Sequence, residues 1–301
     1  MNSLRTPEER FVALPNFDFS PHYVEIADGD GGNLRVHYLD EGPADGPVVL
    51  LLHGEPSWSY LYRYMIPVLN GHGLRTIAPD LVGFGRSDKP TQRSDYTYQN
   101  HVNWLRATIV ALKLSSINLV CQDWGGLLGL RIVGENPELF SRVIAANTSF
   151  PTGDKPASAA FLAWQKFSQE SQEFPIGQII NTGCSSDLTP EVIAAYNAPF
   201  PDESYKEGAR KFPTLVPTSP DNPASADNRK AWEALKKFTR PFLCAFSDQD
   251  PVTAGGEKQF LRDVLGCAGQ NHTVLTGAGH FLQEDCGPEF AEIIATFIAT
   301  T

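Results

Sequence analysis

The chain has 301 residues, of which 42% are apolar and 20% are charged, and this composition is typical of an ordinary globular protein. Its net charge of −11 argues against a phosphate-binding surface, so nucleic acid is not an expected partner. The 5 cysteines are scattered without Cys-x-x-Cys spacing, which indicates neither a disulfide framework nor a zinc site.

Neither the beginning of the chain nor its apolar runs point to a membrane. The first residues, MNSLRTPEERF, lack the apolar stretch of a signal peptide. The longest continuous apolar run, residues 159–164, is far too short to cross a bilayer. We therefore expect a soluble, cytoplasmic protein.

Short strand-like runs alternate with helix-compatible stretches along the chain. Residues 33–40 (NLRVHYLD) alternate apolar and polar, which predicts a half-exposed antiparallel strand. Six later runs are apolar on both faces, as in strands buried in a parallel sheet: residues 48–52, 76–78, 117–121, 143–146, 242–246 and 273–275. Helical candidates lie near residues 60–70, 96–113, 125–136, 257–265 and 288–299. This alternation predicts an α/β fold with a mostly parallel central sheet flanked by helices.

One region interrupts that alternation. Residues 150–230 contain no comparable strand run, and ten prolines separate helical pieces near residues 159–168, 190–195 and 205–211. We expect a helical insertion between two strands. The predicted division is a core of residues 1–149 and 231–301 and a helical cap of residues 150–230.

Residues 121–126 (CQDWGG) join a buried strand to a helix, with an acid at the junction and two glycines beyond it. A nucleophile elbow is such a sharp turn and needs small neighbours. Asp123 stands in the nucleophile position, and Cys121 stands where glycine is usual. A helix N-terminus favours an ionised carboxylate. The alternative is that Asp123 only caps the helix.

Two further segments after strand ends complete a possible triad. His280 follows the last strand in a glycine-rich loop, in the order nucleophile, acid, histidine. Asp248 and Asp250 compete for the role of the acid after the preceding strand. We favour Asp250, because Pro251 biases it toward an extended conformation.

Residues 53–58 (HGEPSW) follow an earlier strand and would supply part of an oxyanion hole. The expected donors are the backbone N–H groups of Glu55 and Trp124. A carboxylate beside an oxyanion hole is unusual. We therefore expect the Glu55 side chain to point away or to accept a hydrogen bond that holds another residue.

Together these residues resemble the α/β-hydrolase superfamily, and within it the haloalkane dehalogenases whose loops read Gln-Asp-Trp-Gly and His-Gly-Glu-Pro. The likeness covers nearly the whole chain, including residues 80–90, 198–205, 210–213 and 279–284. A sister subfamily carries its acid after the strand that precedes the cap. The corresponding segment 147–149 here has none, which supports Asp250.

The resemblance implies the remaining site residues. Two indole N–H groups, of Trp124 and Trp164, would hold the departing halide, because an indole suits a weakly hydrated anion in an apolar pocket. We expect Trp58, Trp104 and Trp232 to be structural. The expected pocket lining is Phe161, Phe212, Pro213, Val216 and Val252.

The implied reaction is hydrolysis of a small halogenated aliphatic substrate to alcohol, halide and a proton, through an ester on Asp123, by a monomer without metal or other cofactor. The nearest alternative is an epoxide hydrolase, which would protonate an alkoxide with cap tyrosines such as Tyr196 and Tyr205. A fluoroacetate dehalogenase would want an arginine, and none follows Asp123 directly. A non-catalytic member of the fold would lack part of the triad.

Overall fold

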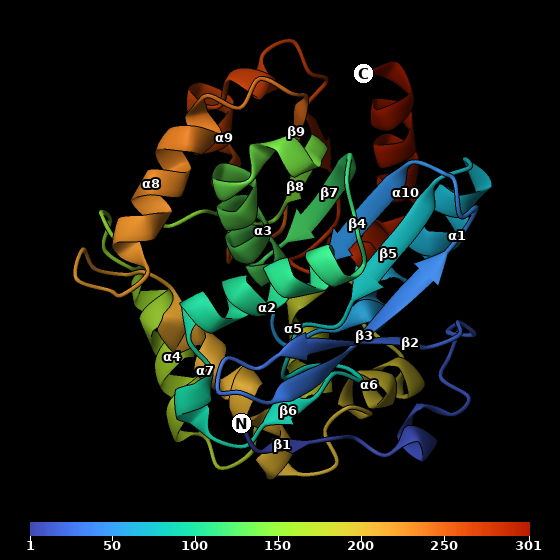
Figure 1. The fold of residues 1–301 in the computed structure, drawn as a ribbon, viewed down its shortest axis with the longest axis vertical. Coiled ribbons are helices and arrows are strands. Elements are labelled where there is room, and N and C mark those ends of the chain that lie inside the picture. The colour runs from blue at the N-terminus through green and yellow to red at the C-terminus, as the bar shows by residue number, and fades with distance from the viewer.

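The computed structural model describes residues 1–301, apart from the side chain of Ala160. Its centre is an 8-stranded sheet in the order β10-β9-β8-β7-β4-β5-β3-β2 (Figure 1). The strands are β2 (His22–Ala27), β3 (Asn33–Glu41), β4 (Val48–Leu52), β5 (Arg75–Pro79), β7 (Ile117–Gln122), β8 (Phe140–Ala146), β9 (Phe242–Ser247) and β10 (Thr273–Leu275). A separate pair joins β1 (Ser3–Leu4) to β6 (Lys89–Pro90).

The six strands from β10 to β5 run parallel to one another. Strand β3 is antiparallel to β5, and β2 is antiparallel to β3. The predicted α/β fold, the antiparallel strand at residues 33–40 and the parallel runs are confirmed. The sequence did not reveal β2, which lies at the edge of the sheet and alternates only weakly between buried and exposed residues.

Helices cover both faces of the sheet (Figure 1). In the figure, α1 and α10 lie on one side, and α2, α3 and α8 lie on the other. Their bounds are α1 (Met65–Gly71), α2 (Tyr98–Ala111), α3 (Trp124–Glu135), α8 (Ser225–Lys236), α9 (Glu257–Asp263) and α10 (Leu282–Thr300). Short 3-10 helices occupy Glu8–Phe11, Ser59–Tyr62, Arg93–Asp95, Pro137–Leu139, Glu203–Lys206 and Leu265–Cys267.

Two predicted helices differ from the structure. The stretch 60–70 is a 3-10 turn followed by the short α1, not one helix. Helix α10 begins at Leu282, six residues before the predicted start, and is kinked at Cys286 (φ −144°, ψ 32°). Pro288 has no N–H to donate to the preceding turn, so the sequence favoured a helix that begins at this proline and not before it.

The segment between β8 and β9 is helical, as predicted. It contains α4 (Ala159–Glu170), α5 (Ile176–Gly183), α6 (Pro190–Asn197) and α7 (Glu207–Leu215), which gather in the lower half of Figure 1. Helix α5 was not predicted. Helix α8 runs across the predicted boundary at residue 230 and packs against α3, so the division into core and cap stays a prediction.

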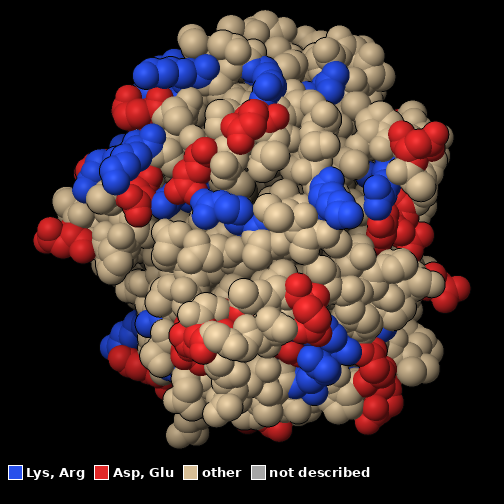
Figure 2. All heavy atoms as spheres, in the orientation of Figure 1, with Lys and Arg blue, Asp and Glu red and all other residues tan. Residues whose placement is uncertain are grey.

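On the face drawn in Figure 2, basic and acidic side chains are interspersed. Ion pairs such as Arg93–Glu207 (2.6 Å) and Arg229–Asp154 (3.1 Å) join the two signs. Among the described residues, no helix has both the length and the apolar character needed to cross a membrane.

Candidate active site

Asp123 occupies the sharp turn between β7 and α3. Its backbone has φ 49° and ψ −124°, a conformation that non-glycine residues rarely adopt. A Cβ on Gly125 would lie 2.0 Å from Leu52 O, and one on Gly126 would lie 2.0 Å from Thr148 Oγ1. Both glycines are therefore required for α3 to approach the sheet, as the elbow pattern predicted.

His280 lies between two carboxylates. Its Nε2 is 3.6 Å from Asp123 Oδ2, and its Nδ1 is 3.1 Å from Asp250 Oδ2. Asp248 instead accepts a hydrogen bond from Gly277 N (2.8 Å) and so holds the loop before the histidine. Of the two competing acids, only Asp250 contacts the imidazole.

The charges around His280 determine its proton affinity. Burial alone lowers the pKa of an imidazole, but the hydrogen bonds and charges of Asp123 and Asp250 outweigh that effect and raise the pKa of His280 to about 10. Burial would raise the pKa of Asp250, yet its hydrogen bond and charge interaction with His280 and a further hydrogen bond from Thr253 hold it below the ordinary value. The unmodified site therefore favours an imidazolium between two carboxylates.

Two buried side-chain amides hold the loop that carries His280, residues 276–281, which we call the histidine loop. Neither amide was expected from the sequence to belong to the site. Gln122 Nε2 donates to His280 O (3.2 Å) and lies 3.1 Å from His280 Nε2. Asn147 Nδ2 donates to Gly279 O (2.9 Å) and His280 O (3.0 Å). Both amides stand at the carboxyl end of a buried strand, and that position was the available signal.

The loop after β4 supplies an amide to Asp123. Glu55 N donates to Asp123 Oδ1 (2.8 Å), as expected of an oxyanion-hole donor. Trp124 N belongs to the first turn of α3, where N–H groups have no partner within the helix. His53 fixes the loop: Leu81 N donates to its Nε2 (3.0 Å), so its Nδ1 carries the proton and donates to Gly54 O (2.9 Å).

Two orientations were expected for the Glu55 side chain, and the hydrogen bond of one of them is not formed at Oε1, which has no partner among the described residues. Glu55 is one of the residues that line the cavity, as Asp123 is. Burial, followed by the charge of Asp123, raises the pKa of Glu55 well above its ordinary value. This shift favours the uncharged form of the side chain, which lessens the electrostatic conflict with an oxyanion that the sequence suggested.

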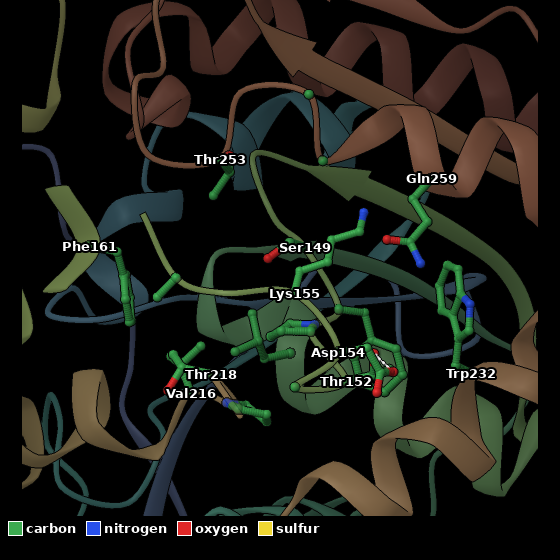
Figure 3. A pocket seen from close by; sticks show the side chains of 18 of the residues that line it. Ser149, Thr152, Asp154, Lys155, Phe161, Val216, Thr218, Trp232, Thr253 and Gln259 are labelled. Atoms are coloured by element: carbon green, nitrogen blue, oxygen red, sulfur yellow. Dashed lines mark hydrogen bonds between the residues drawn. The ribbon is translucent and has the colours of Figure 1, made fainter. Parts of the chain in front are cut away.

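A cavity of about 1040 Å³ is lined by Asp123, and Figure 3 shows the side chains around it. Its wall includes Trp124, Trp164 and four of the five predicted lining residues, namely Phe161, Pro213, Val216 and Val252. Val252 is 60% exposed, which places it toward the outside.

The prediction for Phe212 was wrong. Its side chain is fully buried and does not reach the cavity wall. The centroid of its ring lies 4.5 Å from that of the Trp124 ring and 4.3 Å from that of the His101 ring. Phe212 therefore supports Trp124 from behind, because α7 turns this side chain toward the core.

Three of the five tryptophans line the cavity, and the halide-binding role expected of two of them stays a prediction. Trp124 and Trp164 both line the cavity. Trp104 Nε1 donates to Asp28 O (3.1 Å), and Trp58 is fully buried. Trp232, which was expected to be structural, lines the outer cavity, near Gln259 in Figure 3.

Comparison with known proteins gives one consistent family. A model of the alpha/beta hydrolase fold matches residues 47–285. A haloalkane dehalogenase of Psychrobacter cryohalolentis is 57% identical, over 99% of this chain and 98% of its own length. A haloalkane dehalogenase of Mycobacterium marinum is 48% identical, over 99% of this chain and 100% of its own.

Solved structures agree. The haloalkane dehalogenase DpaA of Paraglaciecola agarilytica, described as tetrameric, superposes with a TM-score of 0.91 at 37% identity and covers 100% of this chain and 99% of its own. DbeA of Bradyrhizobium elkani, also a haloalkane dehalogenase, gives 0.77 at 26% identity, over 94% of this chain and 100% of its own.

Proposed function

This chain belongs to the haloalkane dehalogenases of the α/β-hydrolase fold, and we propose that it hydrolyses carbon–halogen bonds through Asp123, Asp250 and His280. The single observation that carries the residue assignment is the position of Asp123. Its carboxylate lies at a strained elbow, 3.6 Å from His280, and faces a cavity whose wall includes the indoles of Trp124 and Trp164.

In the first step, Asp123 Oδ2 attacks the carbon that bears the halogen, and the carbon–halogen bond breaks as the ester bond forms. The carboxylate needs no deprotonation and the halide needs no proton, so His280 takes no part. Glu55 N holds Asp123 Oδ1 at 2.8 Å and thereby orients the other oxygen toward the cavity. The indoles of Trp124 and Trp164 stabilise the emerging halide.

In the second step, His280 Nε2 removes a proton from a water that attacks the carbonyl carbon of the ester. The oxyanion is stabilised by the amides of Glu55 and Trp124, and Asp250 stabilises the imidazolium. The tetrahedral intermediate collapses as the bond between the former carbonyl carbon and the alkyl oxygen breaks. The departing alkoxide takes the proton of the newly added hydroxyl group, which releases the alcohol and returns the carboxylate of Asp123, and the proton taken from water stays on His280 as the imidazolium of the free enzyme.

The two cap tyrosines that an epoxide hydrolase would need do not support that alternative. Tyr196 is fully buried, and its hydroxyl donates to Glu284. Tyr205 is not among the residues that line the cavity. Neither hydroxyl is therefore placed to protonate an alkoxide above Asp123.

Product analysis tests the reaction class. The enzyme is incubated with 1,2-dibromoethane, 1-chlorobutane and styrene oxide while halide release and diol formation are followed. We expect halide from the haloalkanes. Diol from styrene oxide without halide from either haloalkane would overturn the proposal in favour of epoxide hydrolysis.

Two variants test the residue roles. Asp123→Asn should abolish turnover, because an amide is a poor nucleophile. His280→Phe should still release one equivalent of halide and retain the alkyl group on Asp123, visible as a mass increase. Failure to form this adduct with a good substrate would contradict the two-step scheme.

The assembly and the compartment of the protein stay predictions, a monomer and the cytoplasm. Light scattering after size exclusion measures the mass in solution against the 33.0 kDa of one chain. A tetramer, as described for the related structure from Paraglaciecola, would overturn the prediction of a monomer.

A further inference from the structure

The predicted cap contacts the backbone of the catalytic histidine directly. The segment 183–186 connects α5 to the turn before α6. Gly183 O accepts hydrogen bonds from His280 N (2.7 Å) and Phe281 N (3.3 Å). The histidine loop is therefore held by this segment as well as by the core amides.

Asp285 joins the same two pieces of chain through four hydrogen bonds. Its Oδ1 accepts from Ser186 N (2.9 Å) and Ser186 Oγ (2.6 Å). Its Oδ2 accepts from Ser185 N (2.9 Å) and Gly279 N (2.8 Å). A single carboxylate oxygen thus bridges the segment 183–186 and the residue before His280. Hydrogen bonds to an ionised carboxylate are stronger than those between neutral groups.

The backbone around Asp285 is built for this contact. A Cβ on Gly279 would lie 2.5 Å from Gly183 O and 2.9 Å from Ser185 N, so only glycine permits the approach. The kink at Cys286 separates the first turn of α10, which ends in Asp285, from the rest of that helix. Asp285 and His280 therefore lie on one short piece of backbone.

A third tie reaches the loop of the acid. Ser185 Oγ donates to Gln249 Oε1 (3.0 Å), and Gln249 directly precedes Asp250. The segment 183–186 consequently contacts the loops of both His280 and its carboxylate partner.

We propose that Asp285 is a positioning residue for ester hydrolysis: it clamps the segment 183–186 onto the histidine loop and so fixes His280 Nε2 over the ester carbonyl. This inference rests on the proposed two-step function. The first step uses Asp123 and the two indoles and needs no base, so loss of the clamp affects the second step selectively.

Asp285→Asn tests the proposal, because an amide offers only one oxygen to the four donors. Pre-steady-state halide release and the mass of the quenched enzyme are followed with 1,2-dibromoethane. We expect the rate of the halide burst to stay within twofold of the wild-type rate. Hydrolysis of the ester should slow about tenfold, because a misplaced general base loses only part of the rate enhancement that such a base provides. Alkyl-enzyme should therefore accumulate at steady state.

Two further variants make the result specific. Glu292→Gln removes an exposed carboxylate from the same helix, where it pairs with His72, and should change neither step. Ser186→Ala removes one of the four hydrogen bonds and should give a smaller accumulation of ester. The burst amplitude counts only folded enzyme, so partial unfolding does not imitate the effect.

Equal slowing of both steps in Asp285→Asn, or no accumulation of ester in either Asp285→Asn or Ser186→Ala, would overturn the positioning role. His280→Phe separates this failure from a failure of the mechanism. If His280→Phe traps the ester and the Asp285 variant does not, only the clamp is refuted.

Discussion

Replacing Asp123 by asparagine should sharply lower the proton affinity of His280. In the wild type, burial is outweighed by Asp123 and Asp250, and the pKa of His280 is raised to about 10. Asp123→Asn removes one of the two negative charges while preserving the shape of the side chain. The same charge is lost when the carboxylate becomes an ester, so the variant imitates the electrostatics of the intermediate.

The expected magnitude follows from the separation of the charges. Two unit charges 3.6 Å apart attract by about 4.6 kcal/mol at an effective dielectric constant of about 20. That energy corresponds to a factor on the order of a thousand in the proton-binding constant of the imidazole. At pH 8 the wild-type imidazole should be charged and the variant imidazole largely neutral.

Nuclear magnetic resonance of isotopically labelled histidine measures this titration, and His280→Phe assigns the resonance among the 7 histidines. Asp248→Asn is the matched control, because Asp248 accepts from Gly277 N and does not touch the imidazole. An unchanged titration of His280 in Asp123→Asn would refute the reasoning. The expected fall explains how the imidazolium of the free enzyme becomes the base of the second step: forming the ester releases its proton.

Three further outcomes are expected. Glu55→Gln should change the steady-state rate at pH 7 by less than about fivefold, because burial raises the pKa of Glu55 well above its ordinary value and favours the uncharged form that glutamine imitates; a hundredfold loss would show a charged or proton-transferring role. Trp164→Phe should weaken bromide binding, measured by quenching of tryptophan fluorescence, about tenfold or more through loss of a hydrogen bond to an anion, and unchanged quenching would remove Trp164 from the site. Phe212→Ala should lower the free energy of unfolding in denaturant by about 3–5 kcal/mol, because the fully buried ring supports Trp124; a cost below 1 kcal/mol would contradict that packing role.

The local sequence was sufficient for the parallel strands and for the order of the reactive groups, although it missed β2 and α5. Continuous apolar runs identify strands buried on both faces, and the groups that follow them must meet at one edge of a parallel sheet. Asp123 and His280 could therefore be chosen before any distance was known. The need for the two glycines after Asp123 could also be predicted, because a sharp turn between a strand and a helix has room only for small neighbouring side chains.

Other assignments depended on contacts between distant parts of the chain. Asp248 and Asp250 are two residues apart on one loop, and only the fold decides which faces His280. Phe212 and Val216 lie four residues apart, yet the first is buried and the second lines the cavity, because packing against Trp124 and not composition sets the direction.

The chain by itself determined which residue types stand at the strand ends, because hydrophobic periodicity and turn chemistry are local. Tertiary structure decided that burial raises the pKa of Glu55 and that Asp285 binds both the segment 183–186 and Gly279. Burial and long-range hydrogen bonding create these properties. The hydrogen bond from Ser185 to Asp285 joins residues 100 positions apart, a span over which no sequence periodicity extends.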